Sequence, residues 1–258
     1  MRIGFFDSGI GGITVLHQAL KILPNEDYLF YADTANAPYG EKTEEEVREF
    51  IVNAVDFIAN QKVKALVIAC NTATSLVIEE LRSQYDFPIL GIEPAIKPAI
   101  EQLKGRKKKV LVVATSLTLK GKKYNDLVHR IDQREIVDSL PLPGLVRFAE
   151  SFEFDENKII PYLEKELSSY DLDQYGTVVL GCTHFPYFEG ALKTFFPKDV
   201  HFISGSIGTA KNLKRILELK PPTIEGTGNI IFYRAGVEVV DPFLLSKYHN
   251  LFKVLDEI

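Results

Sequence analysis

Short apolar runs alternate along the chain with longer segments whose apolar positions recur every three or four residues. The short runs are rich in β-branched and aromatic residues and are bounded by polar turn formers, a pattern that predicts buried parallel strands. The predicted strands lie at residues 3–6, 28–32, 64–69, 88–92, 110–113, 177–180, 201–203 and 229–233.

The longer segments have the spacing of amphipathic helices. Thr43 and Glu46 form a capping box at the start of one of them. Predicted helices cover residues 13–23, 43–58, 95–103, 124–131, 145–150, 159–167, 187–195 and 207–217, with two more around 77–81 and from about 242. Residues 220–228, rich in Pro and Gly, form the best linker-like stretch. Strands alternating with helices predict an α/β fold with mainly parallel sheets and helices on both faces.

Composition narrows the class of protein without changing this fold. A chain of 258 residues with 46% hydrophobic residues can form one large domain or two ordinary ones. The net charge of −5 gives no electrostatic reason to expect a nucleic acid or an anionic membrane as a partner. No apolar stretch approaches the ~18 residues of a membrane span, and the first strand starts too early for a signal peptide. We therefore expect a cytoplasmic protein.

Cys70 and Cys182, the only two cysteines, each follow a predicted strand and precede a predicted helix. An isolated cysteine at such a place is often an inert core residue. Here the pattern occurs twice, and polar residues follow each thiol: Asn71 and Thr72 in one case, Thr183 and His184 in the other. A helix N-terminus lowers a thiol pKa from about 8.5, so we expect both thiols to be reactive. Neither a C-x-x-C spacing nor a His cluster predicts a zinc site.

The glycine-rich loop after the first strand leaves an alternative open. Gly9 and Gly11 suggest a dinucleotide-binding turn, but the fingerprint requires glycine at position 14, where Thr14 stands. We expect instead that these glycines let a ligand approach the backbone. Asp7, at the end of the strand, is either a helix cap or a proton-transfer group near a thiol.

Two thiols on facing α/β units suit the transfer of a proton from one face of a carbon atom to the other. One thiolate removes the hydrogen and the opposing thiol supplies another, while hydrogen-bond donors and helix N-termini stabilise the developing negative charge. We predict that the site lies in the cleft between the units. Asp7 and His184 are the candidate proton shuttles, one on each side.

Four motifs together resemble the glutamate racemase family of the cofactor-independent amino-acid racemases. They are Asp7-Ser8-Gly9-x-Gly11-Gly12, Pro38-Tyr39-Gly40, Ala69-Cys70-Asn71-Thr72-Ala73 and Gly181-Cys182-Thr183-His184-Phe185-Pro186. The resemblance runs through the whole chain. It implies two similar doubly wound domains, residues 1–95 plus 207–258 and residues 96–206, with the active site in the cleft between them. It also implies interconversion of L- and D-glutamate for peptidoglycan without cofactor or metal, and a homodimer.

The resemblance also assigns expected roles to residues. Cys70 and Cys182 would be the two acid/base catalysts, assisted by Asp7 and His184. The residues expected to bind the substrate are Asp7, Ser8, Tyr39, Gly40, Asn71, Thr72, Thr115, Thr118, Thr183 and His184. Glu150 stands where the family often has a glutamate near the histidine, but the preceding segment, residues 142–149, departs from the commoner pattern and leaves its role open.

Three alternatives remain at this point. The chain could be an aspartate racemase or another relative that acts on a different acid. It could be an NAD-dependent oxidoreductase that uses the loop at Gly9. It could also be a binding domain that holds an amino acid without exchanging its α-hydrogen.

Overall fold

The computed structural model contains two sheets, and the structure describes residues 1–219 and 226–257. The six-stranded sheet has the order β10-β9-β2-β1-β3-β4. Its strands are β1 (Ile3–Asp7), β2 (Tyr28–Ala32), β3 (Ala65–Ile68), β4 (Ile89–Gly91), β9 (Ile230–Arg234) and β10 (Val237–Glu238). All neighbours in this sheet pair in parallel except β9 and β10.

The four-stranded sheet has the order β6-β5-β7-β8 and is parallel throughout. Its strands are β5 (Lys109–Ala114), β6 (Val137–Pro141), β7 (Tyr175–Leu180) and β8 (His201–Ser204). The central strands β1, β3, β5 and β7 are almost fully buried, which explains why they appear in the sequence as continuous apolar runs. The expected fold class, two mainly parallel α/β units, is confirmed.

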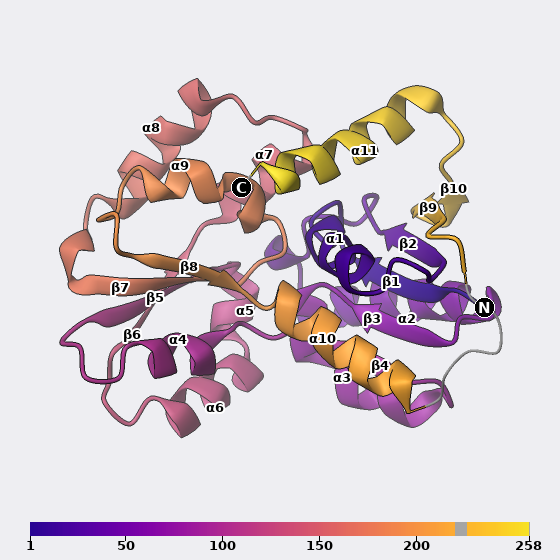
Figure 1. Cartoon of the computed structure of the whole chain (residues 1–258), viewed down its shortest axis with the longest axis horizontal. Helices are drawn as coiled ribbons and strands as arrows, with labels where there is room; N and C mark the ends of the chain where they lie inside the picture. Colours follow the sequence, from indigo (N-terminus) through magenta and orange to yellow (C-terminus); the bar gives the residue numbers. More distant parts are fainter. Residues whose placement is uncertain (220–225, 258) are drawn as a thin grey trace.

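Helices cover both sheets, as Figure 1 shows. Around the first sheet lie η1 (Tyr39–Glu41), α1 (Ile13–Ile22), α2 (Glu44–Asn60), α3 (Asn71–Gln84) and α10 (Ser206–Glu218). Around the second lie α4 (Ile96–Gln102), α5 (Ser116–Lys120), α6 (Lys122–Ile131), α7 (Pro143–Glu150), α8 (Glu156–Leu167), η2 (Leu172–Gln174), η3 (Phe185–Phe188) and α9 (Glu189–Lys193). Each sheet and the helices around it form one lobe of the molecule. The last helix, α11 (Pro242–Asp256), contacts both α1 and η3 and so links the two lobes.

The structure differs from the expected elements in a few places. Strand β6 was not predicted because its sequence, with Asp138 and Ser139 inside it, is half exposed and not apolar. The helix predicted at 187–195 is confirmed only in part: the short α9 lies within it, but the residues before α9 form the 3₁₀ turn η3, and the break comes at Phe188. The linker predicted at 220–228 lies partly outside the described residues. No helix among the described residues is long and apolar enough to cross a membrane.

The capping box at Thr43 forms as predicted and gives a test of the local structure. The Thr43 hydroxyl accepts a hydrogen bond from the Glu46 amide, and the Glu46 carboxylate accepts one from the Thr43 amide. Replacing Thr43 with Ala should lower the free energy of unfolding by about 1 kcal/mol, because α2 loses its N-terminal acceptor. Denaturant unfolding measures this loss, and Thr43→Ser is the matched control. Equal stability of the Ala and Ser variants would contradict the assignment.

Candidate active site

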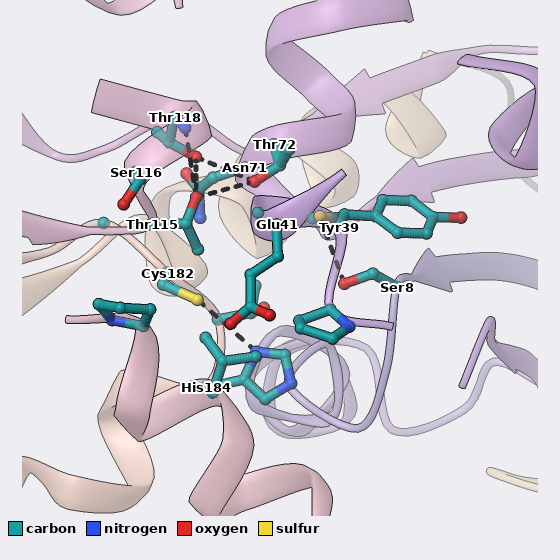
Figure 2. Close-up of a pocket in the computed structure, with 17 residues that line it drawn as sticks. Ser8, Tyr39, Glu41, Asn71, Thr72, Thr115, Ser116, Thr118, Cys182 and His184 are labelled. Carbon is teal, nitrogen blue, oxygen red and sulfur yellow. Dashed lines mark hydrogen bonds between the residues drawn. The ribbon is translucent and has the colours of Figure 1, made fainter. Parts of the chain in front are cut away.

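The carboxyl ends of strands from both sheets meet at one pocket. Ser8 follows β1 and Cys70 lies just beyond β3 in the first sheet, while Thr115 follows β5 and Cys182 lies just beyond β7 in the second. Ligands of parallel α/β sheets bind at this end of the strands. Figure 2 shows the side chains that line the pocket.

Eleven of the residues expected from the sequence line this pocket: Ser8, Tyr39, Gly40, Cys70, Asn71, Thr72, Thr115, Thr118, Cys182, Thr183 and His184. Two others, Asp7 and Glu150, lie behind the wall and contact residues that line it. The structure therefore brings the expected residues together from segments far apart in the chain.

Cys70 is the N-cap residue of α3 and is buried. Its Sγ accepts a hydrogen bond from the Ala73 amide at 3.4 Å and donates one to the Ser8 hydroxyl at 3.7 Å. Burial raises the pKa of the Cys70 thiol, and the nearby Asp7 carboxylate raises it further. The Ala73 amide at the helix N-terminus lowers this pKa as expected, but the desolvation of a thiolate outweighs it, so the pKa is raised overall. Burial thus favours the neutral thiol of Cys70 over the thiolate.

Cys182 begins a chain of polar contacts with His184 and Glu150. The Cys182 Sγ lies 3.6 Å from His184 Nδ1, and His184 Nε2 lies 2.5 Å from Glu150 Oε1. Burial disfavours the imidazolium, but the bonds to Cys182 and Glu150 outweigh it and raise the pKa of His184 well above its usual value. The sequence left the role of Glu150 open, and the geometry indicates that Glu150 orients the ring of His184.

Two glycines of the 7–12 loop allow this arrangement. A Cβ atom on Gly9 would lie 1.8 Å from Glu150 Oε1, and one on Gly11 would lie 2.5 Å from both His184 Nδ1 and Thr183 Oγ1. The Ile10 amide also donates to Glu150 Oε1 at 2.8 Å. The expectation that these glycines admit a ligand is wrong, because the side chains of Glu150 on α7 and of Thr183 and His184 after β7 fill the space in front of them.

Asp7 is fully buried at the end of β1. Its Oδ2 accepts a hydrogen bond from the Gly12 amide at 2.7 Å, and the Thr183 hydroxyl donates to the same oxygen at 3.4 Å. Burial raises the pKa of Asp7 to about 6, while His184 and the Gly12 amide lower it in part. Gly12 is the N-cap residue of α1, so Asp7 fixes the start of that helix. Asp7 thus combines the two roles that the sequence offered as alternatives: a structural contact and an ionisable group that titrates near neutral pH.

Three threonine hydroxyls form a triangle across the two lobes. The Thr72 hydroxyl lies 3.1 Å from that of Thr115 and 3.0 Å from that of Thr118, and Thr115 donates to Thr118 at 2.9 Å. All three residues are buried. The triangle can rearrange to present hydroxyl donors to an anion.

Tyr39 and Asn71 contribute differently from each other. The Tyr39 hydroxyl donates to Asp33 Oδ2 at 2.5 Å, and Figure 2 shows its ring pointing away from the thiols, so the Tyr39 side chain is not available to a ligand. The Asn71 Oδ1 atom is buried and has no hydrogen-bond partner among the described residues. A buried unpaired acceptor is costly, so Asn71 is suited to receive a donor from a ligand.

Several lining residues were not predicted from the sequence. They are Pro38, Glu41, Ser116, Pro143, Val146 and Gly181. Glu41 directly follows the Pro38-Tyr39-Gly40 motif, and that adjacency was the available signal. Pro143 and Val146 lie on α7, and nothing in the neighbouring sequence indicates that they line a pocket.

Among the described residues that line the pocket, His184 alone can carry a positive charge, and the other groups offer a ligand dipoles. None of these lining residues is Lys or Arg. Within residues 1–219 and 226–257 no group of three or more metal-ligating side chains occurs. Negative charge on a ligand would therefore be stabilised by hydroxyls, backbone N–H groups and the N-terminal ends of helices.

Comparisons with known proteins agree with this geometry. The family model described as Asp/Glu/Hydantoin racemase matches residues 13–207. The chain is 59% identical over 257 residues to glutamate racemase 2 of Bacillus subtilis strain 168, covering 100% of this chain and 97% of that protein. Glutamate racemase of Halothermothrix orenii is 53% identical, with coverage of 98% and 99%.

A solved structure gives the same result for the fold. The crystal structure of Escherichia coli glutamate racemase in complex with L-glutamate and the activator UDP-MurNAc-ala superposes with a TM-score of 0.83 at 27% identity, covering 96% of this chain and 95% of that one. The family match extends over most of the chain and includes both cysteine strands. This chain belongs to the Asp/Glu/Hydantoin racemase family.

Proposed function

We propose that this protein is a glutamate racemase that interconverts L- and D-glutamate by moving a proton at the α-carbon. The observation that carries the proposal is the meeting of Cys70 and Cys182, each from a different sheet, in one small pocket lined by hydrogen-bond donors. The identity of 59% to a glutamate racemase over the full chain supports glutamate as the substrate.

The reaction requires one thiolate and one thiol on opposite faces of the substrate. The thiolate takes the α-proton, and the electron pair of the broken C–H bond passes to the α-carbon and its carboxylate. The opposing thiol then gives its proton to the other face of that carbon and becomes the thiolate. Since no electrons enter or leave, the reaction needs no redox cofactor. The resemblance to glutamate racemases implies that it needs no pyridoxal phosphate or metal either.

His184 and Asp7 fit the role of proton-transfer assistants. His184 lies 3.6 Å from the Cys182 Sγ, so it can accept the thiol proton or return it. Glu150 acts through His184, because it holds the far side of the ring. Asp7 has no direct hydrogen bond to Cys70, but its charge raises the pKa of that thiol, so the protonation of the two groups is coupled.

The substrate-binding roles follow from the donors and acceptors on the wall. The unpaired Asn71 Oδ1 is placed to accept a hydrogen bond from the substrate ammonium group. Hydroxyls and backbone N–H groups would bind the two carboxylates. We assign this role to Ser8, Tyr39, Gly40, Thr72, Thr115, Thr118 and Thr183. Because the Tyr39 phenol is bonded to Asp33, Tyr39 would contact the substrate through its backbone.

The organisation of the whole molecule is part of the proposal. We assign residues 1–95 plus 207–258 to one domain and residues 96–206 to the other. The pairing of β9 with β2 and the packing of α10 on α1 support the return of the C-terminal segment to the first domain. We propose a cytoplasmic homodimer that supplies D-glutamate for peptidoglycan, as the resemblance to glutamate racemases implies.

The alternatives differ in how well the pocket supports them. A dinucleotide at the Gly9 loop would meet Glu150, whose carboxylate already occupies that space. Aspartate differs from glutamate by one methylene, and the geometry of the ligand-free pocket does not select between the two acids. Similarity to relatives favours glutamate, and parallel assays with both acids decide the matter.

The first prediction concerns isotope placement. With protiated L-glutamate in D₂O, the D-glutamate formed should carry α-deuterium from the first turnovers, because the second thiol has exchanged with solvent. Recovered L-glutamate should stay protiated at early times. Separation of the enantiomers followed by mass spectrometry measures both pools. Deuterium entering L-glutamate as fast as D-glutamate forms would contradict the division of work between two thiols, and failure to racemise glutamate at all would refute the proposed function.

The two thiols should be individually indispensable. Cys70→Ala and Cys182→Ala should each abolish racemisation, because neither face of the substrate has a second base. Both variants should remain folded, since each change removes one sulfur atom and leaves a small cavity. Polarimetry measures turnover and thermal unfolding checks the fold. A folded Cys182→Ala protein with near-normal turnover would rule out the assignment.

The raised pKa of Asp7 predicts a pH-dependent stability. A pKa of about 6 in the folded protein, against 3.8 ordinarily, means that the folded state binds this proton more tightly than the unfolded chain. Asp7 therefore stabilises the fold below pH ~4, and that contribution is lost as the pH rises to ~6, by about 3 kcal/mol in total. Asp7→Asn should remove this fall in unfolding free energy. Parallel pH profiles of the two proteins would contradict the pKa.

A further inference from the structure

An ion pair spans the mouth of the pocket and joins the two lobes. Glu41 ends η1, which belongs to the first lobe, and Arg147 lies on α7 of the second lobe. The Arg147 Nη1 atom lies 2.6 Å from Glu41 Oε1, although the two residues are 106 positions apart in the chain. Figure 2 shows the Glu41 side chain extending across the pocket toward the side that carries Cys182 and His184.

The space behind this ion pair is too small for a substrate. The space in the pocket that the centre of a water molecule can occupy has a volume of about 20 Å³. A single water molecule needs roughly 10–15 Å³ by this measure, so the closed pocket holds one or two waters and no amino acid. Entry and release of glutamate therefore require the mouth to open.

Segment η1 closes the mouth at two points. Gly40 packs directly on Thr115, since a Cβ atom there would lie 2.9 Å from the Thr115 Cβ. The next residue, Glu41, makes the ion pair with Arg147. Both contacts join the first lobe to the second, so separation of the lobes at the mouth breaks both together.

The same helix that carries Arg147 also carries Glu150, one turn further on. Glu150 accepts hydrogen bonds from Ile10 and pairs with His184 beside Cys182. A contact that fixes the exposed face of α7 therefore also fixes the helix from which Glu150 reaches the histidine.

We propose that the Glu41–Arg147 ion pair is a latch that holds the mouth of the active site closed over the substrate and keeps α7 in place behind His184. This proposal rests on the proposed function for the identity of the substrate, but its main test does not require turnover. Arg147 and Glu41 act here as positioning residues. Their side chains are 60% and 44% exposed, so the latch is of the strength of a surface ion pair and can open readily.

The two cysteines report directly on the opening of the mouth. They are the only thiols in the chain, both line the pocket, and they are 5% and 7% exposed. Alkylation by iodoacetamide, a neutral reagent, measures how often they become accessible. Glu41→Gln and Arg147→Gln should each increase the alkylation rate by about 2- to 5-fold, which corresponds to the loss of one exposed ion pair.

The direction of both effects separates a latch from a simple change in local charge. Loss of the Glu41 carboxylate would favour the thiolates and speed alkylation, whereas loss of the Arg147 guanidinium would disfavour them and slow it. A latch predicts faster alkylation in both variants. The charge-exchanged protein, with Glu41→Arg and Arg147→Glu together, should return to the wild-type rate.

A matched control exists inside the first lobe. Arg48 pairs with Glu80 at 2.6 Å with similar exposure, but this pair joins α2 to α3 and does not cross the mouth. Arg48→Gln should leave the alkylation rate unchanged. In turnover assays the two latch variants should raise KM for both enantiomers by about 2- to 5-fold, because the bound substrate is held less well.

Several results would overturn the proposal. Slower alkylation of Arg147→Gln, failure of the charge exchange to restore the rate, or an unchanged KM in folded latch variants would each refute a latch. A wild-type protein that fails to racemise glutamate would refute the proposed function instead, and the alkylation rates would still test the opening of the mouth.

Discussion

The structure depends on the burial of ionisable groups between two parallel sheets that turn their carboxyl ends toward each other. Water is excluded there, so each charged form must be stabilised by the protein itself. Burial raises the pKa of the Cys70 thiol and raises that of Asp7 to about 6. His184 is the exception, since its contacts with Cys182 and Glu150 outweigh the cost of burying its charge. The protonation states of the site are thus set by packing as much as by the residues themselves.

The two halves of the site are similar in position and different in electrostatics. Each sheet places one cysteine at a strand end, followed by hydroxyl or amide groups. On the Cys182 side, a histidine and a glutamate complete a chain of ionisable partners. On the Cys70 side, the sulfur contacts a serine hydroxyl and a backbone amide, and the carboxylate of Asp7 acts from a distance. A reaction that is symmetric in its chemistry can therefore use unlike acids and bases on its two faces.

Contacts across the lobes also decide how the pocket opens. The 7–12 loop of the first lobe packs on Glu150 and His184 of the second, while the threonine triangle and segment η1 bridge the lobes on other sides. These contacts surround the space in which a substrate would lie. Any motion that admits a substrate must therefore disturb some of the groups proposed to act on it, which links binding to the arrangement of the catalytic side chains.

The sequence by itself determined most of the strands and helices and the residues that stand at their ends. Continuous apolar runs, the capping box at Thr43 and the two cysteine motifs are local signals, because they depend on the period of the backbone and on neighbouring residues. The sequence did not determine the partner of Glu150, the direction of the Tyr39 phenol, the raised pKa of Cys70 or the pairing of Glu41 with Arg147. Glu41 and Arg147 are 106 positions apart and Glu150 and His184 are 34 apart. The Tyr39 phenol is directed by its bond to the buried Asp33, and the pKa of Cys70 depends on burial from all sides. Only the folded chain brings such groups together and removes water from between them, so only the tertiary structure decided them.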